Sequence, residues 1–184
     1  FRFGTFIALQ GLWLGPYLMD TKGYSPILTG NLLILMAIGT ILGGPIAGRL
    51  ADRAFLSQKG VALWGLSFYG LSLFPLIGFM KINDPFWYGL TFFSLGFFSG
   101  SGVVIYSHAM ALFPMSISGT VTAWINFFTM AGGAILMPVM GKIIESFPRN
   151  NHSYPPEAYR SGFLICFLGM AASILVYAFC KKEK

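Results

Sequence analysis

The chain has 184 residues, of which 55% are hydrophobic, 17% aromatic and only 10% charged. This composition leaves too few polar side chains to cover a soluble globule of this length, so it indicates an integral membrane protein. The formal net charge of +6 does not indicate a nucleic-acid-binding protein, because Lys and Arg are scattered through the connecting segments and form no basic stripe beside stacking aromatic residues.

The first two candidate membrane spans are separated by a short turn. The first span runs from Phe3 to Met19 without a charged residue, and the second runs from Ile27 to Gly48. Each run is close to the ~20 apolar residues that a helix needs to cross a bilayer. Gly23, Ser25 and Pro26 lie between the two runs and predict the turn.

Three further spans follow in the middle of the chain. The third is predicted over Gly60 to Met80. The stretch from Pro85 to Gly141 has no Asp, Glu, Lys or Arg and is too long for one membrane helix, so it predicts two spans. The break is expected at Phe113 to Gly119, where Pro, Ser and Gly crowd together. It divides the stretch into spans over Phe86 to Phe113 and Gly119 to Gly141.

The last predicted span covers Ser161 to Cys180, after a polar segment from Lys142 to Arg160. The predicted fold class is therefore an all-α membrane protein with six transmembrane helices. Glycines four residues apart predict surfaces on which another helix backbone can approach closely. These pairs are Gly39 and Gly43, Gly44 and Gly48, and Gly96 and Gly100.

The six spans divide into two similar units, residues 1–84 and 85–184. In each unit a short connection follows the first span and a longer polar connection follows the second, and the second span carries a late proline, Pro45 or Pro138. Because each unit has three spans, the two copies are expected to lie inverted in the membrane. Two inverted repeats are typical of transporters with matching gates around a midplane site.

The distribution of basic residues predicts the orientation of the spans. If the N-terminus faces the cytoplasm, that side receives more of the Lys and Arg residues, among them Arg2, Arg49, Arg53 and Lys59. This bias predicts that both termini are cytoplasmic. No predicted span has a Lys or Arg near its middle. The main countercharge for an anionic solute is therefore expected outside this chain.

Polar side chains inside the spans are the candidates for a solute site, because they are costly in lipid unless they face a partner or a water-filled cavity. In the first span, Gln10, Trp13 and Tyr17 have the spacing of one helix face and predict a polar and aromatic surface. Further candidates in the fourth and fifth spans are Ser101, Tyr106, Asn126 and Thr129. The alternative for each Ser or Thr is a hydroxyl bonded back to its own helix.

His108 is a candidate for proton coupling. It is the only side chain within a predicted span whose usual pKa allows a change of charge near physiological pH. The alternative is that His108 lies near the membrane interface and bonds to a neighbouring helix.

The end of the second span resembles a known signature. Gly48-Arg49-Leu50-Ala51-Asp52-Arg53 is similar to the G-x-x-x-D-R core of the loop motif of the major facilitator superfamily. The chain departs from the family pattern after Arg53, as is typical of the copy in the C-terminal half of these transporters. Phe113 to Thr120, with Asn126 and Gly132-Gly133, resembles the family's tenth-to-eleventh helix region, and Tyr159 to Phe163 resembles the approach to its last helix.

The resemblance implies that the chain forms helices seven to twelve of a secondary transporter, a symporter or antiporter, which moves a small solute by alternating access. Its expected partner is the N-terminal six-helix half of the same transporter. The segment Leu12 to Tyr17 resembles the corresponding helix of some bacterial anion carriers, which suggests an anion as the solute and the bacterial inner membrane as the location.

The resemblance also gives Gly48, Asp52 and Arg53 a role at a gate. In the family, the matching acidic residue links to the start of the eleventh helix and latches the cytoplasmic gate. Here the Asp52 carboxylate is expected to reach the exposed N–H groups around Ser118 to Thr120. The alternative is that Asp52 only lowers the positive charge of a solvated turn.

Other classes of protein are less well supported by the residues. An enzyme would need a nucleophile beside a base, or His and carboxylate ligands on facing helices, and the spans provide no such group. The sequence therefore predicts no catalytic residue, no metal site and no cofactor. The remaining alternatives are a self-contained six-helix protein that dimerises as a carrier or channel, and a structural membrane subunit without transport.

Overall fold

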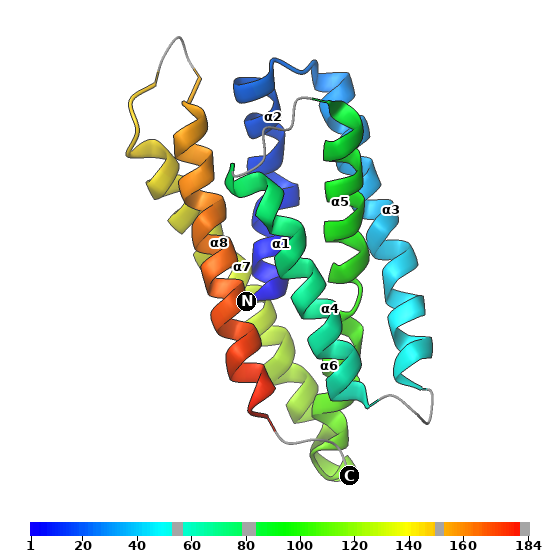
Figure 1. Ribbon diagram of the computed structural model, residues 1–184. Helices are drawn as coiled ribbons and strands as arrows, with labels where there is room; N and C mark the ends of the chain where they lie inside the picture. The colour runs from blue at the N-terminus through cyan, green and yellow to red at the C-terminus, as the bar shows by residue number, and fades with distance from the viewer. Residues whose placement is uncertain (53–56, 79–83, 150–152, 181–184) are drawn as a thin grey trace.

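The computed structural model describes residues 1–52, 57–78, 84–149 and 153–180, and these residues form a bundle of helices without a β-strand (Figure 1). Five of the helical segments are long and apolar enough to cross a membrane. The sixth segment, from Arg2 to Lys22, is helical throughout but includes a π-helical turn. The elements are α1 Arg2–Ala8, a π-helix Leu9–Trp13, α2 Leu14–Lys22, α3 Pro26–Ala51, α4 Gln58–Leu73, a 3₁₀ helix Phe74–Ile77, α5 Pro85–Ser99, α6 Gly102–Ala111, a 3₁₀ helix Met115–Ile117, α7 Ser118–Glu145 and α8 Pro156–Ala178.

Local sequence signals explain where several helices begin. Ser25 Oγ accepts a hydrogen bond from the N–H of Leu28 at the start of α3, and Ser57 Oγ does the same for Gly60 at the start of α4. Asp84 Oδ1 accepts from the N–H of Phe86 at 2.8 Å, directly before α5. Such side-chain acceptors satisfy N–H groups that have no partner within the helix.

The predicted connection from Lys142 to Arg160 is wrong in its extent. In the structure α7 continues to Glu145 and α8 begins at Pro156, so both helices extend beyond their apolar runs. The helices continue because Lys142 and Glu145 do not interrupt the backbone hydrogen bonds of α7. The apolar runs therefore indicated the membrane-spanning part of each helix rather than its full length.

The bundle has two ends, which we call the Asp20 end and the Asp52 end after an acidic residue at each. The Asp20 end contains the last turn of α2 and the first turns of α3, α5 and α8, and the Asp52 end contains the last turns of α3 and α8 (Figure 1). At the Asp52 end, Lys59 Nζ donates hydrogen bonds to the carbonyls of Ala178, at 2.7 Å, and Cys180. This lysine therefore joins the start of α4 to the final turn of α8, where a positive charge is favourable.

Glycine contacts join α3 to α5. A Cβ atom on Gly39 or Gly43 would overlap the backbone of α5, and a Cβ atom on Gly96 or Gly100 would overlap the backbone of α3. The predicted close approach at these two pairs is confirmed. The pair of Gly44 and Gly48 differs, because nothing lies within 4 Å of a Cβ placed on Gly48.

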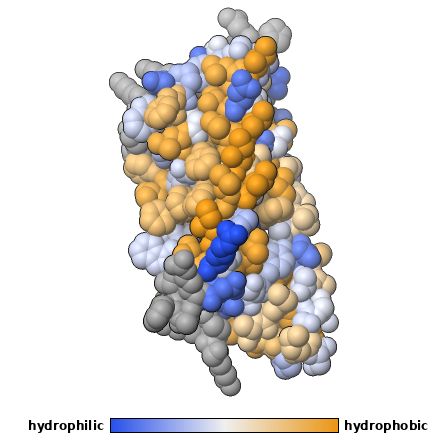
Figure 2. Space-filling model, turned by 90° about the vertical axis from the view of Figure 1, so that its right-hand side faces the viewer, coloured by the Kyte–Doolittle hydropathy of each residue, from blue (hydrophilic) through white to orange (hydrophobic). Residues whose placement is uncertain are grey.

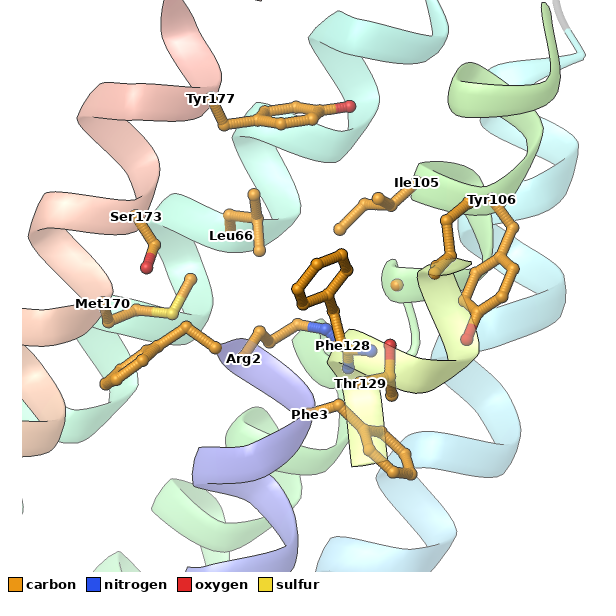
Figure 3. Close-up of a pocket in the computed structure, with 13 residues that line it drawn as sticks. Arg2, Phe3, Leu66, Ile105, Tyr106, Phe128, Thr129, Met170, Ser173 and Tyr177 are labelled. Atoms are coloured by element: carbon orange, nitrogen blue, oxygen red, sulfur yellow. The ribbon is translucent and has the colours of Figure 1, made fainter. Parts of the chain in front are cut away.

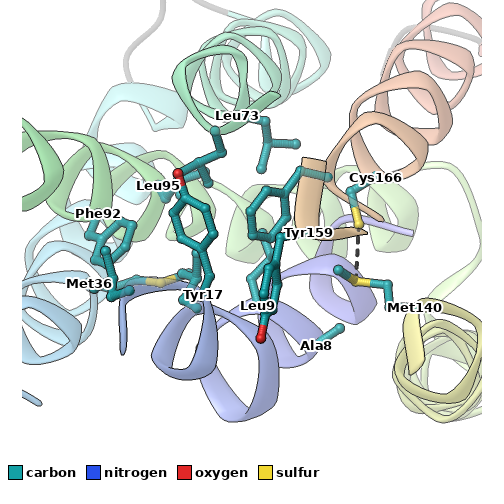
Figure 4. Close-up of a cluster of buried hydrophobic side chains, with 14 of the residues drawn as sticks. Ala8, Leu9, Tyr17, Met36, Leu73, Phe92, Leu95, Met140, Tyr159 and Cys166 are labelled. Carbon is teal, nitrogen blue, oxygen red and sulfur yellow. Dashed lines mark hydrogen bonds between the residues drawn. The ribbon is translucent and has the colours of Figure 1, made fainter. Parts of the chain in front are cut away.

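The buried core lies mostly between this pair of helices and α8, toward the Asp20 end. Tyr17, Phe92, Tyr159 and other large side chains fill it, and the Cys166 thiol contacts Met140 Sδ at 3.5 Å (Figure 4). The face shown in Figure 2 is mostly apolar over its middle, with hydrophilic side chains mostly toward its two ends. An apolar band between polar ends is the surface that a lipid bilayer requires.

Candidate functional site

Arg2 lies inside the bundle rather than at either end. The N-terminus of the chain is near mid-height of the bundle, where α1 begins (Figure 1). Arg2 Nη1 donates to Ser99 Oγ at 2.6 Å and also to the carbonyl oxygen of Ser99. The expectation that this chain provides no basic side chain at mid-depth is therefore wrong. Arg2 stands directly before the first apolar run, so in the sequence it has the position of a charge that flanks a span.

The Arg2 side chain lies at the break between α5 and α6. Ser99 is the last residue of α5, and α6 begins at Gly102. The carbonyls at the end of a helix carry partial negative charge and lack partners within the helix, so they attract a guanidinium. A Cβ atom on Gly102 would overlap the guanidinium of Arg2, so the glycine leaves the space that this side chain occupies.

A hollow of about 370 Å³ opens beside Arg2, between α1, α3, α6 and α7. Its volume is in the range of small-molecule sites. Most of its wall is apolar, and the polar side chains in it come from five different helices. They are Arg2, Thr40, Ser99, Tyr106 and Thr129.

A second hollow of about 300 Å³ lies on the side of Arg2 that faces α4 and α8 (Figure 3). Tyr106 and Thr129 also line it, together with Ser173 and Tyr177 of α8. Phe1 is part of its wall. Residues that precede Phe1 in a longer chain would lie next to this hollow, whereas the first hollow does not include Phe1 in its wall. The first hollow is therefore the better candidate for a solute site.

Three residues proposed from the sequence lie together near Arg2. The Tyr106 hydroxyl donates to Asn126 Oδ1 at 2.8 Å, which joins α6 to α7. Thr129 is one turn further along α7 and lines both hollows. Tyr106, Asn126 and Thr129 thus form a polar corner beside the guanidinium.

Ser101 lies apart from this corner. It is 4% exposed, and its hydroxyl donates to the carbonyl of Phe98 at 2.7 Å. A Cβ atom on Gly65 of α4 would overlap Ser101, so this serine packs against α4. The geometry is that of the alternative expectation, a hydroxyl bonded back to its own helix.

Gln10, Trp13 and Tyr17 do not form one accessible face. The π-helical turn over Leu9–Trp13 inserts extra backbone into the helix, so Tyr17 is rotated away from the position that regular α-helical spacing predicts. Tyr17 is 6% exposed, whereas Gln10 and Trp13 are partly exposed. The Trp13 indole packs near Gly141, and its Nε1 has no hydrogen-bond partner among the described residues.

Tyr17 instead belongs to a cluster of tyrosines at the Asp20 end. Its hydroxyl shares a hydrogen bond of 3.0 Å with the hydroxyl of Tyr88 on α5, and its ring lies edge-on to Tyr159 of α8. Asp20 Oδ2 accepts from the Tyr159 hydroxyl at 2.6 Å and from the N–H of Tyr154 at 3.2 Å. These contacts connect α2, α5 and α8.

Tyr24, in the turn between α2 and α3, lies beside the same cluster. Its ring is edge-on to Tyr88, with the ring centres 6.1 Å apart. Partial burial raises the pKa of Tyr24 above its usual value, and the nearby Asp84 carboxylate raises it further. Tyr24 is therefore uncharged at neutral pH.

His108 is buried on α6, with 2% of its surface exposed. Its Nδ1 shares a hydrogen bond of 2.6 Å with the hydroxyl of Tyr177 on α8. Tyr177 also lines the second hollow, next to Arg2 (Figure 3). One side chain therefore separates the imidazole from that hollow.

The loop signature lies at the Asp52 end. Asp52 is the residue that ends α3, and Gly48 faces open space one turn earlier. Within the described part of the chain, no hydrogen bond joins the Asp52 side chain to Ser118 to Thr120. The expected latch is therefore absent in this conformation. Arg53 lies outside the described residues.

Sequence reasoning missed Arg2 and Thr40 as parts of the hollow. It pointed to the Ser-Gly-Ser-Gly stretch from Ser99 to Gly102 near the middle of the fourth span, but chose Ser101 instead of Ser99 as the site residue. The sequence gives no separate signal for Thr40. In the structure its hydroxyl bonds to the Met36 carbonyl of its own helix at 3.0 Å.

Comparison with known sequences identifies similar transport proteins. The sequence model of the Major Facilitator Superfamily matches residues 2–184. The chain is 29% identical over 139 residues to a probable hexose phosphate transport protein of Chlamydia muridarum, covering 73% of this chain and 30% of that protein. It is 28% identical over 142 residues to the glycerol-3-phosphate transporter of Bacillus subtilis, covering 75% of this chain and 32% of that protein.

A solved structure shows a similar arrangement of helices. The proton:xylose symporter XylE bound to 6-bromo-6-deoxy-D-glucose matches with a TM-score of 0.64 and 20% sequence identity. The match covers 98% of this chain and 40% of the symporter. At this identity the similarity is evidence of the fold alone. The aligned region also spans only about a third of the length of the curated relatives.

Proposed function

Because this chain belongs to the major facilitator superfamily, we propose that it is the C-terminal six-helix half of a secondary active transporter that moves a small solute by alternating access. The observation that carries the proposal is the hollow beside Arg2, in which polar side chains from α1, α3, α5, α6 and α7 meet near mid-height of an apolar bundle. Polar side chains, among them a charged guanidinium, are costly at that depth in a membrane protein unless they serve a solute or an ion.

The proposed partner is the N-terminal six-helix half of the same transporter. Relatives that are much longer than this chain support this partner, since the regions that align with it cover only 30% and 32% of two of them. The outer face of α7 exposes Trp124 and Phe127, which are 57% and 60% exposed. Contact with the other half, with lipid around its edge, would cover these side chains.

The internal organisation in this proposal is two inverted repeats, residues 1–84 and 85–184. Each repeat contains three helical segments, and its middle helix, α3 or α7, has an internal proline, Pro45 or Pro138. Inverted units around a midplane site would give the carrier two matching gates.

In the proposed orientation the Asp52 end faces the cytoplasm of a bacterial inner membrane. Arg49 and Lys59 are at this end, where α8 also ends, and the proposal places both termini of the half on this side. Asp52, with Gly48 and Arg53, would act at the cytoplasmic gate. Its latch to the start of α7 would form only when the carrier opens outward.

His108 is the proposed site of proton coupling, as a symporter or antiporter would require. Its hydrogen bond to Tyr177 supports the proposal, because Tyr177 lines the second hollow. A change in the charge of the imidazole would therefore change the electrostatic potential there. Substitution His108→Gln keeps a hydrogen-bonding side chain and removes the imidazole that would carry the proton. We expect it to reduce accumulation driven by a pH gradient about tenfold or more, while exchange between equal solute concentrations continues.

The test is uptake by the full-length transporter in proteoliposomes, with and without a pH gradient. The solutes are hexose 6-phosphates, glycerol 3-phosphate, neutral sugars and amino acids, and protein-free liposomes are the control. Uptake of at least one solute above the control is expected. If no solute enters faster than in protein-free liposomes, the transport proposal is wrong and a structural subunit becomes the better interpretation.

A further inference from the structure

We infer that Arg2 binds an oxyanion of the solute, a phosphate or a carboxylate, in the hollow between α1, α3, α6 and α7. This inference rests on the proposed transport function and names the class of solute. Both hydrogen bonds from Arg2 to Ser99 start from Nη1. Nε and Nη2 have no hydrogen-bond partner among the described residues. These two atoms form the edge of a guanidinium that binds two oxygens of a carboxylate or phosphate at once.

The charge of Arg2 is not balanced by a carboxylate within the described ranges. The acidic residues there lie at the two ends of the bundle, with Asp20, Asp84, Glu145 and Glu157 at one end and Asp52 at the other. A cation inside a membrane protein is costly without a partner, and Ser99 provides only neutral oxygens. An anionic solute would therefore gain more from this position than a neutral solute.

The volume and the hydroxyl groups of the hollow also limit the size and polarity of the rest of the solute. Thr129 lines it with a hydroxyl that has no hydrogen-bond partner among the described residues, and the hydroxyls of Thr40 and Tyr106 each donate elsewhere but can still accept. About 370 Å³ of space and several hydroxyls suit a small polyol that carries one oxyanion. The inferred class is therefore a small phosphorylated or carboxylated polyol.

A purely structural role for Arg2 is the competing explanation. In that case the guanidinium would only stabilise the exposed carbonyls at the end of α5. Both explanations predict that replacing Arg2 lowers stability. Only the binding role predicts that replacing Arg2 weakens stabilisation by an oxyanion relative to the unliganded variant.

The experiment measures binding to the purified full-length carrier by thermal shift as a function of ligand concentration. The probes are inorganic phosphate, glycerol 3-phosphate and glycerate, with glycerol as the uncharged probe. The proteins are wild type, Arg2→Gln, Arg2→Lys and the matched control Lys142→Gln, which removes one exposed positive charge from α7 at the Asp20 end. The dissociation constant follows from the dependence of the shift on ligand concentration.

Wild type and Lys142→Gln are expected to bind at least one oxyanion and not glycerol. Arg2→Gln should bind it about 10- to 100-fold more weakly, because charge-assisted hydrogen bonds are lost. Arg2→Lys keeps the positive charge but loses the paired N–H donors of the guanidinium. Its affinity for the oxyanion should therefore lie between those of wild type and Arg2→Gln. The preference between phosphate and glycerate identifies which oxyanion the site accepts.

The inference is overturned if wild type binds none of the oxyanions, or if Arg2→Gln binds as tightly as wild type. Should Arg2→Gln fail to fold, Arg2→Lys decides, and equal affinity in that variant contradicts the inference. Failure of the transport proposal has a different result, namely intact oxyanion binding with no uptake of any solute. Uptake of a neutral solute without oxyanion binding contradicts the inference alone.

Discussion

The tyrosine cluster at the Asp20 end and the hollow beside Arg2 use polar groups in opposite ways. At the Asp20 end, Asp20, Tyr17 and Tyr159 bond to partners on other helices within the chain. In the hollow, only Nη1 of Arg2 makes hydrogen bonds among the described residues, and the Thr129 hydroxyl has no hydrogen-bond partner there. Satisfied polar groups hold helices together, whereas groups with free donors or acceptors can receive a ligand.

This difference assigns separate roles to the two regions. The cluster joins α2, α5 and α8 and would close that end of the cavity in this conformation. The hollow would recognise the solute. Substitutions in the hollow should therefore change solute affinity, with an added loss of stability where they break the hydrogen bonds of Arg2 to Ser99. Substitutions in the cluster should change stability, or the balance between conformations, with little effect on affinity.

The largest effect is expected from Gly102→Ala, which would disturb the hollow beside Arg2. The new methyl group would occupy the position of the Arg2 guanidinium and displace it from Ser99. The Michaelis constant for an oxyanionic solute should rise about 10- to 100-fold. Uptake by proteoliposomes that contain the full-length carrier measures this constant.

Gly30→Ala is the matched control, because nothing lies within 4 Å of a Cβ placed on Gly30 of α3. It makes the same chemical change in a helix without approaching Arg2. Its Michaelis constant should equal that of wild type. An unchanged constant in Gly102→Ala would mean that the position of Arg2 does not matter for recognition.

A smaller effect, on stability instead of affinity, is expected from Asp20→Asn. The carboxylate accepts from the hydroxyl of Tyr159 and the N–H of Tyr154, and the neutral amide oxygen accepts more weakly. The loss should be about 1–2 kcal/mol of unfolding free energy, at the lower end for charged hydrogen bonds because the site is partly exposed. Thermal unfolding of the purified carrier measures it.

The affinity of Asp20→Asn for the solute is the diagnostic part of that prediction. It should change by less than about threefold, since Asp20 is not part of the hollow's wall. A large loss of affinity with unchanged stability would show that the two regions are not separate.

Much of the bundle could be predicted from the sequence because lipid imposes simple rules. Apolar runs of sufficient length marked the spans, and the glycine pairs at Gly39 and Gly96 marked the contact between α3 and α5. Each of these signals is local: a run of apolar residues, or two glycines at a spacing of four.

The site was less predictable because it depends on geometry that short sequence patterns do not contain. The π-helical turn at Leu9–Trp13 changes the direction of Tyr17, and regular spacing gives no indication of it. The choice of Ser99 over Ser101 as the partner of Arg2 depends on where α5 ends. The depth of Arg2 depends on how α1 is placed against its neighbours.

The smallest effect is expected from Tyr17→Phe, which tests whether the tyrosine cluster and the hollow have separate roles. The substitution removes one hydroxyl from the hydrogen bond with Tyr88 and leaves the ring in contact with Tyr159 and Phe163. Because the partner hydroxyl of Tyr88 loses only a neutral bond, the unfolding free energy should fall by about 0.5–1.5 kcal/mol. Thermal unfolding checks this, and solute affinity should stay at the wild-type value. If affinity instead fell as in Gly102→Ala while stability held, Tyr17 would contact the solute in another conformation, and the accessible face expected from the sequence would be the correct interpretation.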